Sequence, residues 1–290
     1  MPLIDYLASQ VLAFILLAGL LGLIVGSFLN VVIHRLPIMM ERAWLRQSRE
    51  MLEPDVELPP EPVFNIILPH SHCPHCNSEI KAWQNLPVIS YVLLRGRCGQ
   101  CRERISLRYP AVEILTALLS MVVAWQFGFG WDAGAMLLLT WALISLSLID
   151  ADTQLLPDAI VLPLIWLGLI VNSFALFTDL QTALWGAVAG YLSLWLVFWA
   201  FKLATGKEGM GYGDFKLLAM LGAWGGWQIL PLTILLSSLV GAILGIIILK
   251  TRGQSNATPL PFGPYLAIAG WIALIWGDTI TGKYLQIAGF

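Results

Sequence analysis

Long runs of apolar residues dominate the chain, and short polar or glycine-rich turns separate them. A run of about 20 apolar residues is typical of a membrane-spanning helix. Two runs, the sixth and the eighth, are short, so a place partly in the membrane interface is an alternative for them. The pattern predicts an all-α polytopic membrane protein with about eight transmembrane helices, over Val11–Ile33, Ala111–Phe127, Ala133–Ile149, Ala159–Phe177, Leu180–Ala200, Phe215–Gly226, Leu230–Leu249 and Pro264–Trp276.

The composition agrees with this class. Apolar residues make up 58% of the 290 and charged residues only 12%, whereas soluble domains carry about a quarter charged residues. The first ten residues contain an acid and no base, so we expect no cleavable signal peptide. No internal repeat is visible, which argues against an inverted-repeat transporter.

The basic residues orient the predicted helices, because cytoplasmic loops of membrane proteins are enriched in Lys and Arg. Fifteen of the sixteen bases fall on one side of an eight-helix arrangement, and only Lys283 does not. That side is predicted to be cytoplasmic, with both termini outside. The fifteen are Arg35, Arg42, Arg46, Arg49, Lys81, Arg95, Arg97, Arg102, Arg104, Arg108, Lys202, Lys207, Lys216, Lys250 and Arg252.

Two aspartates stand at the ends of apolar runs on this same side. Asp150 follows the third run, and Asp214 precedes the sixth. Acids at such positions often cap helices or solvate loops, and that reading suits Asp152 and Asp158. Two carboxylates in one apolar site cannot both ionise easily, so one keeps a proton while the other acts as a base. Such a pair can activate water against a peptide carbonyl.

Glycines precede Asp214 at positions 209, 211 and 213. Glycine lets the backbone approach closely or adopt positive φ angles. We therefore expect this stretch to bring the backbone of an extended substrate close to Asp214.

The polar block 36–109 is the only sizeable insert between the predicted helices. Its first part, Glu41–Pro62, is expected to be flexible or partly helical. Cys73-x2-Cys76 and Cys98-x2-Cys101 then form two knuckles with zinc-ribbon spacing. A reducing cytoplasmic location disfavours disulfides, and four thiolates leave no open position, so we expect a structural zinc. Iron or a redox dithiol are the alternatives. Neighbouring histidines could replace a ligand, but we expect them to be solvated: His70, His72 and His75.

In sequence, the motif Gly211-Tyr212-Gly213-Asp214 resembles the GxGD motif of intramembrane aspartyl proteases. LIDADTQLLPD (148–158), the four cysteines and PFGPYLA (261–267) are similar to bacterial type IV prepilin peptidases of the PilD type. The resemblance covers nearly the whole chain from GSFLNVVIHRLP (26–37) onward. GxGD alone would be a weak signal, whereas the ordered combination is strong.

The resemblance implies a bifunctional enzyme of the bacterial inner membrane. Asp150 and Asp214 would be the catalytic pair of an aspartic endopeptidase that cuts the short basic leader from type IV prepilins and pseudopilins at the cytoplasmic face. These substrates serve type IV pili and type II secretion. Positioning of the substrate is assigned to Gly211, Gly213, Pro261 and Gly263. The lipid bilayer is the other expected partner, and no nucleic acid is expected.

The resemblance also implies that the new N-terminal residue is methylated with S-adenosylmethionine as cofactor. No nucleotide-binding fingerprint is present, and Gly19–Gly26 reads as a small-residue stripe for helix packing. Gly96 and Glu113 are the candidates for the methyl-transfer region, although Glu113 also fits a helix N-terminal acid. Residues 1–35 would then be the first transmembrane helix, 36–109 the insert with the metal and methyltransferase sites, and 110–290 the peptidase core.

Two other classes of protein were weighed against the enzyme. An ion- or proton-coupled transporter could use Asp150 and Asp214 as relay carboxylates. That class predicts ionisable residues near the middle of the membrane, whereas here they lie at one face. A membrane scaffold that binds a partner through its zinc ribbon would leave the glycines before Asp214 unexplained.

Overall fold

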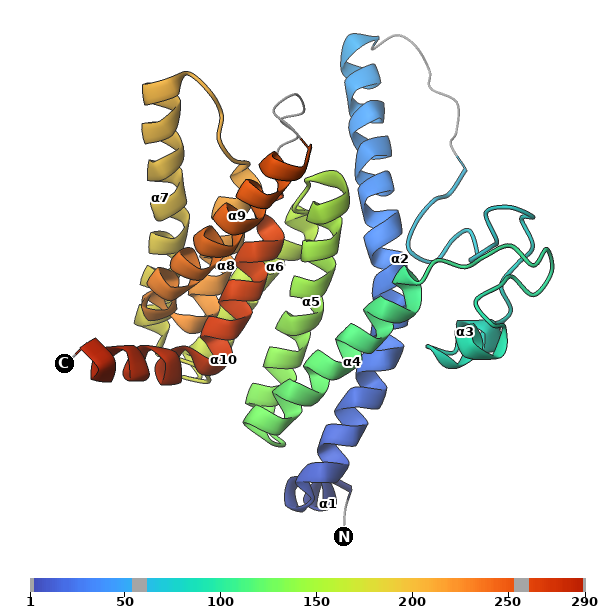
Figure 1. The fold of residues 1–290 in the computed structure, drawn as a ribbon, viewed down its shortest axis with the longest axis horizontal. Coiled ribbons are helices and arrows are strands. Elements are labelled where there is room, and N and C mark those ends of the chain that lie inside the picture. The colour runs from blue at the N-terminus through green and yellow to red at the C-terminus, as the bar shows by residue number, and fades with distance from the viewer. Residues whose placement is uncertain (1–2, 54–61, 253–260, 289–290) are drawn as a thin grey trace. The chain divides into compact units, whose positions relative to one another are not determined.

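The structure is a computed structural model that describes residues 3–53, 62–252 and 261–288. Within these ranges it is all-helical, with no strand (Figure 1). Its elements are α1 (Leu3–Ser9), α2 (Val11–Leu52), η1 (Ala82–Asn85), α3 (Ile89–Leu93), α4 (Arg108–Phe127), α5 (Trp131–Thr153), α6 (Asp158–Ser173), α7 (Leu180–Thr205), α8 (Tyr212–Gly225), η2 (Trp227–Ile229), α9 (Leu230–Arg252) and α10 (Gly263–Ala288).

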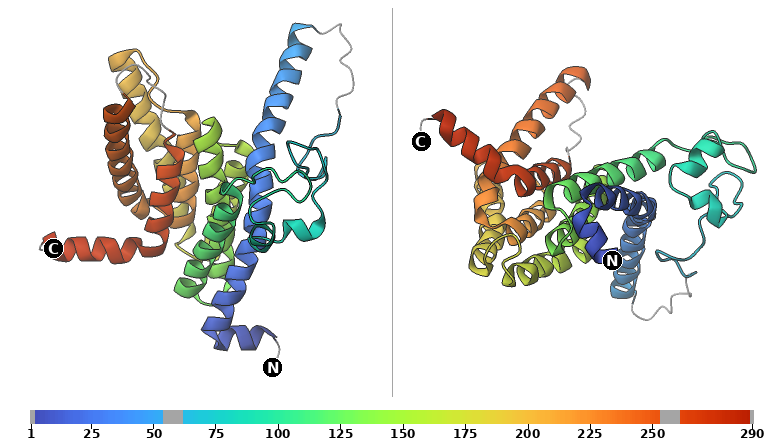
Figure 2. Two further views of the ribbon diagram at one scale, coloured as in Figure 1. Left: turned by 45° about the vertical axis from the view of Figure 1, so that its right-hand side comes forward. Right: turned by 90° about the horizontal axis from the view of Figure 1, so that it is seen from below.

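Each of the eight predicted apolar segments forms a helix. Six of the described helices are long and apolar enough to cross a membrane, which makes the chain a multi-pass membrane protein. The other two are shorter, with 16 residues in α6 and 14 in α8. The expectation that the last segment is short was wrong, because α10 has 26 residues. Figures 1 and 2 show its C-terminal part turning away from its first part.

Helix α2 extends well beyond the predicted membrane segment. It runs for 42 residues through Pro37, as far as Leu52. The lead-in to the insert is therefore helical over its first part, while residues 54–61 lie outside the described ranges. The insert that follows has little regular structure: η1, α3 and two isolated antiparallel bridges, His72–Glu79 and Arg97–Arg104.

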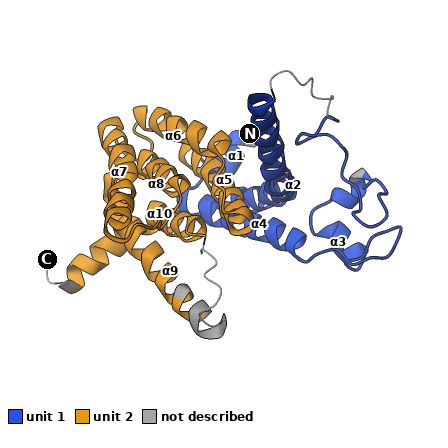
Figure 3. Ribbon diagram, turned by 90° about the horizontal axis from the view of Figure 1, so that it is seen from above, with its two compact units in different colours: residues 1–129 blue, residues 130–290 orange. Residues whose placement is uncertain are grey.

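The chain divides into two compact units, residues 1–129 and 130–290 (Figure 3). In the first unit α2 packs against α4. A Cβ atom at Gly22 would lie 2.8 Å from the Cα of Ala117, and one at Gly26 would lie 2.7 Å from the Cα of Glu113. Only glycine permits so close an approach. The Gly19–Gly26 stripe is thus the contact surface of α2, as predicted.

Helix α8 forms the core of the second unit, where it contacts α6, α7 and α10. All its residues from Phe215 to Trp224 are buried except Lys216. Gly186 of α7 and Gly222 of α8 lie so close that a Cβ at either would meet the other's carbonyl group. A helix buried on all sides needs no polar face, which explains its short, uniformly apolar sequence.

The C-terminal end of α8 is held by a buried asparagine. The Asn172 amide nitrogen donates to the carbonyl oxygens of Ala223 and Trp224 at 2.9 and 2.8 Å. Its oxygen accepts from the backbone N–H of Phe177 at 3.0 Å. These bonds satisfy carbonyl groups that a helix end leaves unpaired. They fix α8 against the end of α6.

Candidate active site and metal centre

Asp150 lies in the last turn of α5, and its side chain is buried, with 5% of the residue exposed. The backbone N–H of Gly263, at the start of α10, donates to its Oδ2 at 3.0 Å. A Cβ at Gly263 would lie 2.6 Å from that oxygen. Glycine is therefore required here, because any side chain would displace the carboxylate. This contact joins two residues that the sequence placed in one site.

Asp214 lies in the first turn of α8 and is 7% exposed. An acid suits this place, since the N-terminal end of a helix is electrically positive. The flanking rings of Tyr212 and Phe215 pack against Phe198 of α7, with centroids 5.3 and 5.6 Å away. The turn that carries Asp214 is thus anchored on both sides by aromatic contacts.

An ion pair adds a further attachment to this turn. Lys216 Nζ lies 2.7 and 2.8 Å from the two carboxylate oxygens of Asp158 at the start of α6. The sequence analysis treated Asp158 only as a helix N-terminal acid and used Lys216 only to orient the predicted helices. The signal in the sequence that could have revealed this ion pair is the position of Lys216, two residues after Asp214.

Both aspartates belong to the second unit. They lie close enough for the charge of Asp150 to act on the carboxyl group of Asp214. Both are buried, although 64 residues separate them in sequence. Neither has a cationic partner among the interactions of the described residues. Two such groups favour a state with one shared proton, which provides one acid and one base.

The glycines before Asp214 serve close packing rather than unusual backbone angles. Gly209, Gly211 and Gly213 all have ordinary φ values, so the suggestion of positive φ there was wrong. A Cβ at Gly213 would lie 2.9 Å from the Cβ of Leu156, and one at Gly209 would lie 3.0 Å from the Phe201 ring. Gly211 is exposed beside Asp214. Pro261 is half-buried and lies just before α10.

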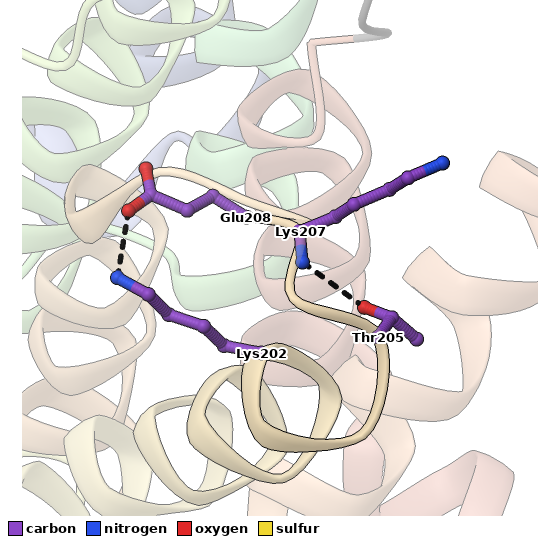
Figure 4. A network of polar contacts seen from close by, with 4 residues as sticks. All are labelled: Lys202, Thr205, Lys207 and Glu208. Carbon is purple, nitrogen blue, oxygen red and sulfur yellow. Dashed lines mark hydrogen bonds and ion pairs between the residues drawn. The ribbon is translucent and has the colours of Figure 1, made fainter.

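The loop between α7 and α8 is held by its own polar contacts (Figure 4). Lys202 Nζ contacts Glu208 Oε1 at 2.8 Å, and the backbone N–H of Lys207 donates to Thr205 Oγ1 at 3.3 Å. Gly206 takes a positive φ of 72°, which ends α7. The loop therefore enters α8 in a defined direction.

The four cysteines form one cluster in the first unit. The sulfur atoms of Cys73, Cys76, Cys98 and Cys101 all lie within 4.8 Å of one another. Those of Cys73 and Cys101 are 3.8 Å apart. Tetrahedral bonds of about 2.3 Å to a zinc ion place sulfurs roughly 3.8 Å apart. The cluster thus fits a four-thiolate metal centre, and no histidine belongs to it among the described residues.

Backbone donors prepare one of these thiols for a metal. The N–H groups of Cys101 and Gln100 lower the pKa of Cys98 to about 6. The Gln100 nitrogen lies 3.5 Å from its sulfur. These donors favour the thiolate, which is the form that binds metals.

A cavity of about 610 Å³ lies in the first unit beside this cluster. Glu113 lines it and is 8% exposed. Its Oε2 accepts the backbone N–H of Val88 at 2.7 Å, and Ser27 also donates to it. Gly96 has a φ of 65°, and a Cβ there would lie 2.7 Å from the hydroxyl oxygen of Tyr91. Because Gly96 has no Cβ, the Tyr91 side chain can pack directly against it. Tyr91 lines the same cavity.

Comparisons with known proteins divide the chain in the same way as its two compact units. Residues 20–127 match the bacterial peptidase A24 N-terminal domain, and residues 137–246 match the type IV leader peptidase family. The second match contains both Asp150 and Asp214.

Several relatives are named "Prepilin leader peptidase/N-methyltransferase". That of Pseudomonas aeruginosa is 68% identical over 290 residues, which is 100% of each chain. That of Stutzerimonas stutzeri is 66% identical over 288 residues, 98% of each. That of Neisseria gonorrhoeae is 52% identical over 264 residues, 91% of each. No solved structure matches the chain.

Proposed function

The chain belongs to the type IV leader peptidase family, and we propose that it removes the leader of type IV prepilins and pseudopilins and methylates the new N-terminal residue. The buried aspartate pair is the observation that carries the first activity. The names of the relatives support both activities. None of the relatives described above is named as a transporter, so that alternative has no support.

Asp150 and Asp214 are the proposed catalytic residues. The ionised member of the pair removes a proton from a water molecule, and the water attacks the scissile carbonyl carbon. The protonated member then gives its proton to the leaving amine. The Gly263 N–H fixes the direction of the Asp150 carboxylate. Gly211 and Gly213 would let the substrate backbone pass close to Asp214, and Pro261 would help to position it.

The proposed place of this reaction is the cytoplasmic face of the bacterial inner membrane. The distribution of Lys and Arg supports that orientation, since it puts both aspartates on the basic side. A substrate with a short basic leader and an apolar helix would be cut where the helix enters the membrane. The acidic pair would attract the leader, which is a modest effect.

Zinc is the metal proposed for the four-cysteine cluster. Cys73, Cys76, Cys98 and Cys101 would hold it, and four thiolates leave it no open coordination position. Its role is therefore structural: it would tie together two loops that have little regular secondary structure of their own.

Gly96 and Glu113 are the residues proposed for the methyl-transfer region, with S-adenosylmethionine as the methyl donor. Glu113 lines the cavity of the first unit, and Gly96 lies against Tyr91, which lines the same cavity. The functional division into residues 1–35, 36–109 and 110–290 stays a prediction. The compact units divide the chain differently, at residue 129, and group α4 with the insert.

Cleavage of a prepilin by the purified full-length protein in detergent tests the proposal, with products read by mass spectrometry. We expect Asp150→Asn and Asp214→Asn each to lower kcat by about 10³-fold or more, since each removes one acid–base partner. Asp152→Asn, at an exposed neighbour of Asp150, is the matched control and should stay within twofold of wild type. Substantial cleavage by either catalytic variant would overturn the pair.

A further inference from the structure

The cavity of the first unit is large enough for a cofactor and holds none of the peptidase aspartates. Its volume of about 610 Å³ lies within the range of small-molecule sites, roughly 300–1,000 Å³. It is bounded by α2, α4 and the loops of the four cysteines. A protein with two activities needs a place for the second reaction, and this cavity lies in a different unit from the first.

Glu113 is the feature of the cavity that packing does not explain. It lies on an apolar helix where α2 approaches most closely, yet it points into the cavity rather than into water. An ionisable side chain at such a position indicates function more often than structure. A carboxylate offers about four acceptor sites, and the donors Val88 and Ser27 occupy two of them. Acceptor capacity remains for a further donor from a ligand.

The backbone is strained at Val88, the residue whose N–H binds the Glu113 carboxylate. Val88 has φ 58° and ψ −46°, which a β-branched residue rarely adopts. In this conformation its N–H donates to Glu113. Strain of this kind carries a free-energy cost and gathers at functional sites. The fold accepts that cost to hold one carboxylate in one orientation.

The other walls carry charges of both signs and aromatic rings. Glu79 and Glu103 contribute further acidic groups, and Arg35 and Arg104 contribute guanidinium groups. Tyr91 and Tyr109 contribute the aromatic rings. Aromatic faces and carboxylates both attract cations. A sulfonium ion and an ammonium ion are both cations, and an adenine ring can stack on a tyrosine.

We infer that this cavity binds S-adenosylmethionine and the new N-terminal amine together, with Glu113 as the group that receives the proton of the amine. The inference rests on the methyltransferase half of the proposed function. The ammonium group gives a proton to Glu113 and becomes a neutral amine. Its lone pair then forms a bond to the methyl carbon, while the carbon–sulfur bond breaks and its electron pair stays on sulfur. The products are S-adenosylhomocysteine and a methylated ammonium, and Glu113 returns its proton to water.

Photochemical cross-linking tests the location. The full-length protein in detergent is irradiated with S-adenosylmethionine labelled in its methyl group, and the modified peptides are identified by mass spectrometry. We expect adducts on peptides that contain Tyr91 or Tyr109, suppressed by excess S-adenosylhomocysteine. Adducts confined to residues 130–290, or a cavity filled only by lipid or detergent, would overturn the inference. Methylation of a pilin by wild type is measured in parallel, and its absence would overturn the proposed methyltransferase itself.

Glu113→Gln tests the role of the carboxylate, because the amide keeps its size and can still accept from Val88. We expect kcat of methyl transfer to fall by about 10²-fold or more, with the photoadduct and prepilin cleavage within twofold of wild type. Glu50→Gln, on the exposed end of α2, is the matched control and should change none of the three. Full methyl transfer in Glu113→Gln contradicts the role. Loss of adduct and cleavage together reduces Glu113 to a structural residue.

Discussion

At the scale of single residues, the orientation of Asp150 depends on a glycine 113 positions away. The Gly263 N–H directs one carboxylate oxygen, and no hydrogen bond to the other oxygen is present among the described residues. A backbone donor does not move or titrate, which makes the orientation permanent. The pair is thereby organised before any substrate arrives.

Gly263→Ala tests this arrangement. The new methyl group would stand 2.6 Å from Asp150 Oδ2, so either the carboxylate or α10 must move. A displacement near 1 Å at a reacting group costs about 10²-fold in rate. We expect that loss in kcat of prepilin cleavage, with methyl transfer within twofold of wild type. Gly282→Ala in the same helix has nothing within 4 Å of its added methyl group and should cleave normally. Equal rates for the two variants would contradict the steric role of Gly263.

Sequence alone singled out the two aspartates that the structure buries, but not what surrounds them. Asp150 and Asp214 stood out because they end apolar runs on the same side of the membrane. In sequence, Glu113 also fitted a simple helix N-terminal acid. The structure adds that Val88, whose N–H donates to Glu113, has a strained backbone, and no sequence pattern reveals that strain. Side-chain contacts between distant segments depend on packing, which hydropathy does not encode.

At the scale of elements, α8 is a short core helix that carries the second aspartate in its first turn. Aromatic rings and the Lys216–Asp158 pair hold its first turn, and Asn172 holds its last. Its length is set by these attachments rather than by the thickness of a membrane. The position of Asp214 is therefore a property of α6, α7 and α8 together.

Asp158→Asn tests whether the ion pair positions this turn. The pair is partly exposed, with 30% and 52% of the two side chains accessible, so its contribution to stability is small. We expect Tm to change little and kcat of cleavage to fall by about tenfold. A displacement of about 1 Å at a reacting group costs about 10²-fold in rate, and Asp214 should shift by less than that. The KM for prepilin should stay within twofold. Asp278→Asn, at an exposed aspartate of the same unit, is the control. A fall in Tm with unchanged kcat would make the pair structural only.

Helix existence was predictable along the whole chain, and helix ends were not. Apolar runs located all eight segments because burial in lipid requires them. The run in α2 ended near Ile33 in sequence, yet the helix continues through Pro37 and the charged residues after it to Leu52. Hydropathy reports where a helix leaves the membrane and not where its hydrogen bonds stop.

At the scale of the whole molecule, the two proposed reactions belong to separate compact units of one chain. Each unit has its own buried carboxylate chemistry: the aspartate pair in residues 130–290 and Glu113 in residues 1–129. The second unit is held by helix packing throughout. The first relies on its insert, where the described residues between α2 and α4 form only two short helical turns and two isolated bridges. We expect a metal held by the four cysteines to compensate for this scarcity of regular structure.

Metal removal should therefore loosen the insert. We expect one zinc per chain by elemental analysis, and its loss in Cys73→Ser, because three thiolates hold the ion far more weakly than four. Without the metal the knuckles lose their link, and trypsin should cut within the stretch that contains the exposed residues Arg95, Arg97, Arg102 and Arg104. Fragments that end in this stretch are read by mass spectrometry.

A chelator applied to the wild-type protein separates the effect of the ion from that of the mutation. Chelation should reproduce the cleavage seen in Cys73→Ser, and added zinc should suppress it in wild type but not in the variant. Because Tyr91 lies in the same loops and lines the cavity, the S-adenosylmethionine adduct should disappear and return with the metal. If neither chelator nor zinc changes the trypsin fragments, the loops keep their conformation without the metal. The four-cysteine centre would then need a role other than a structural one.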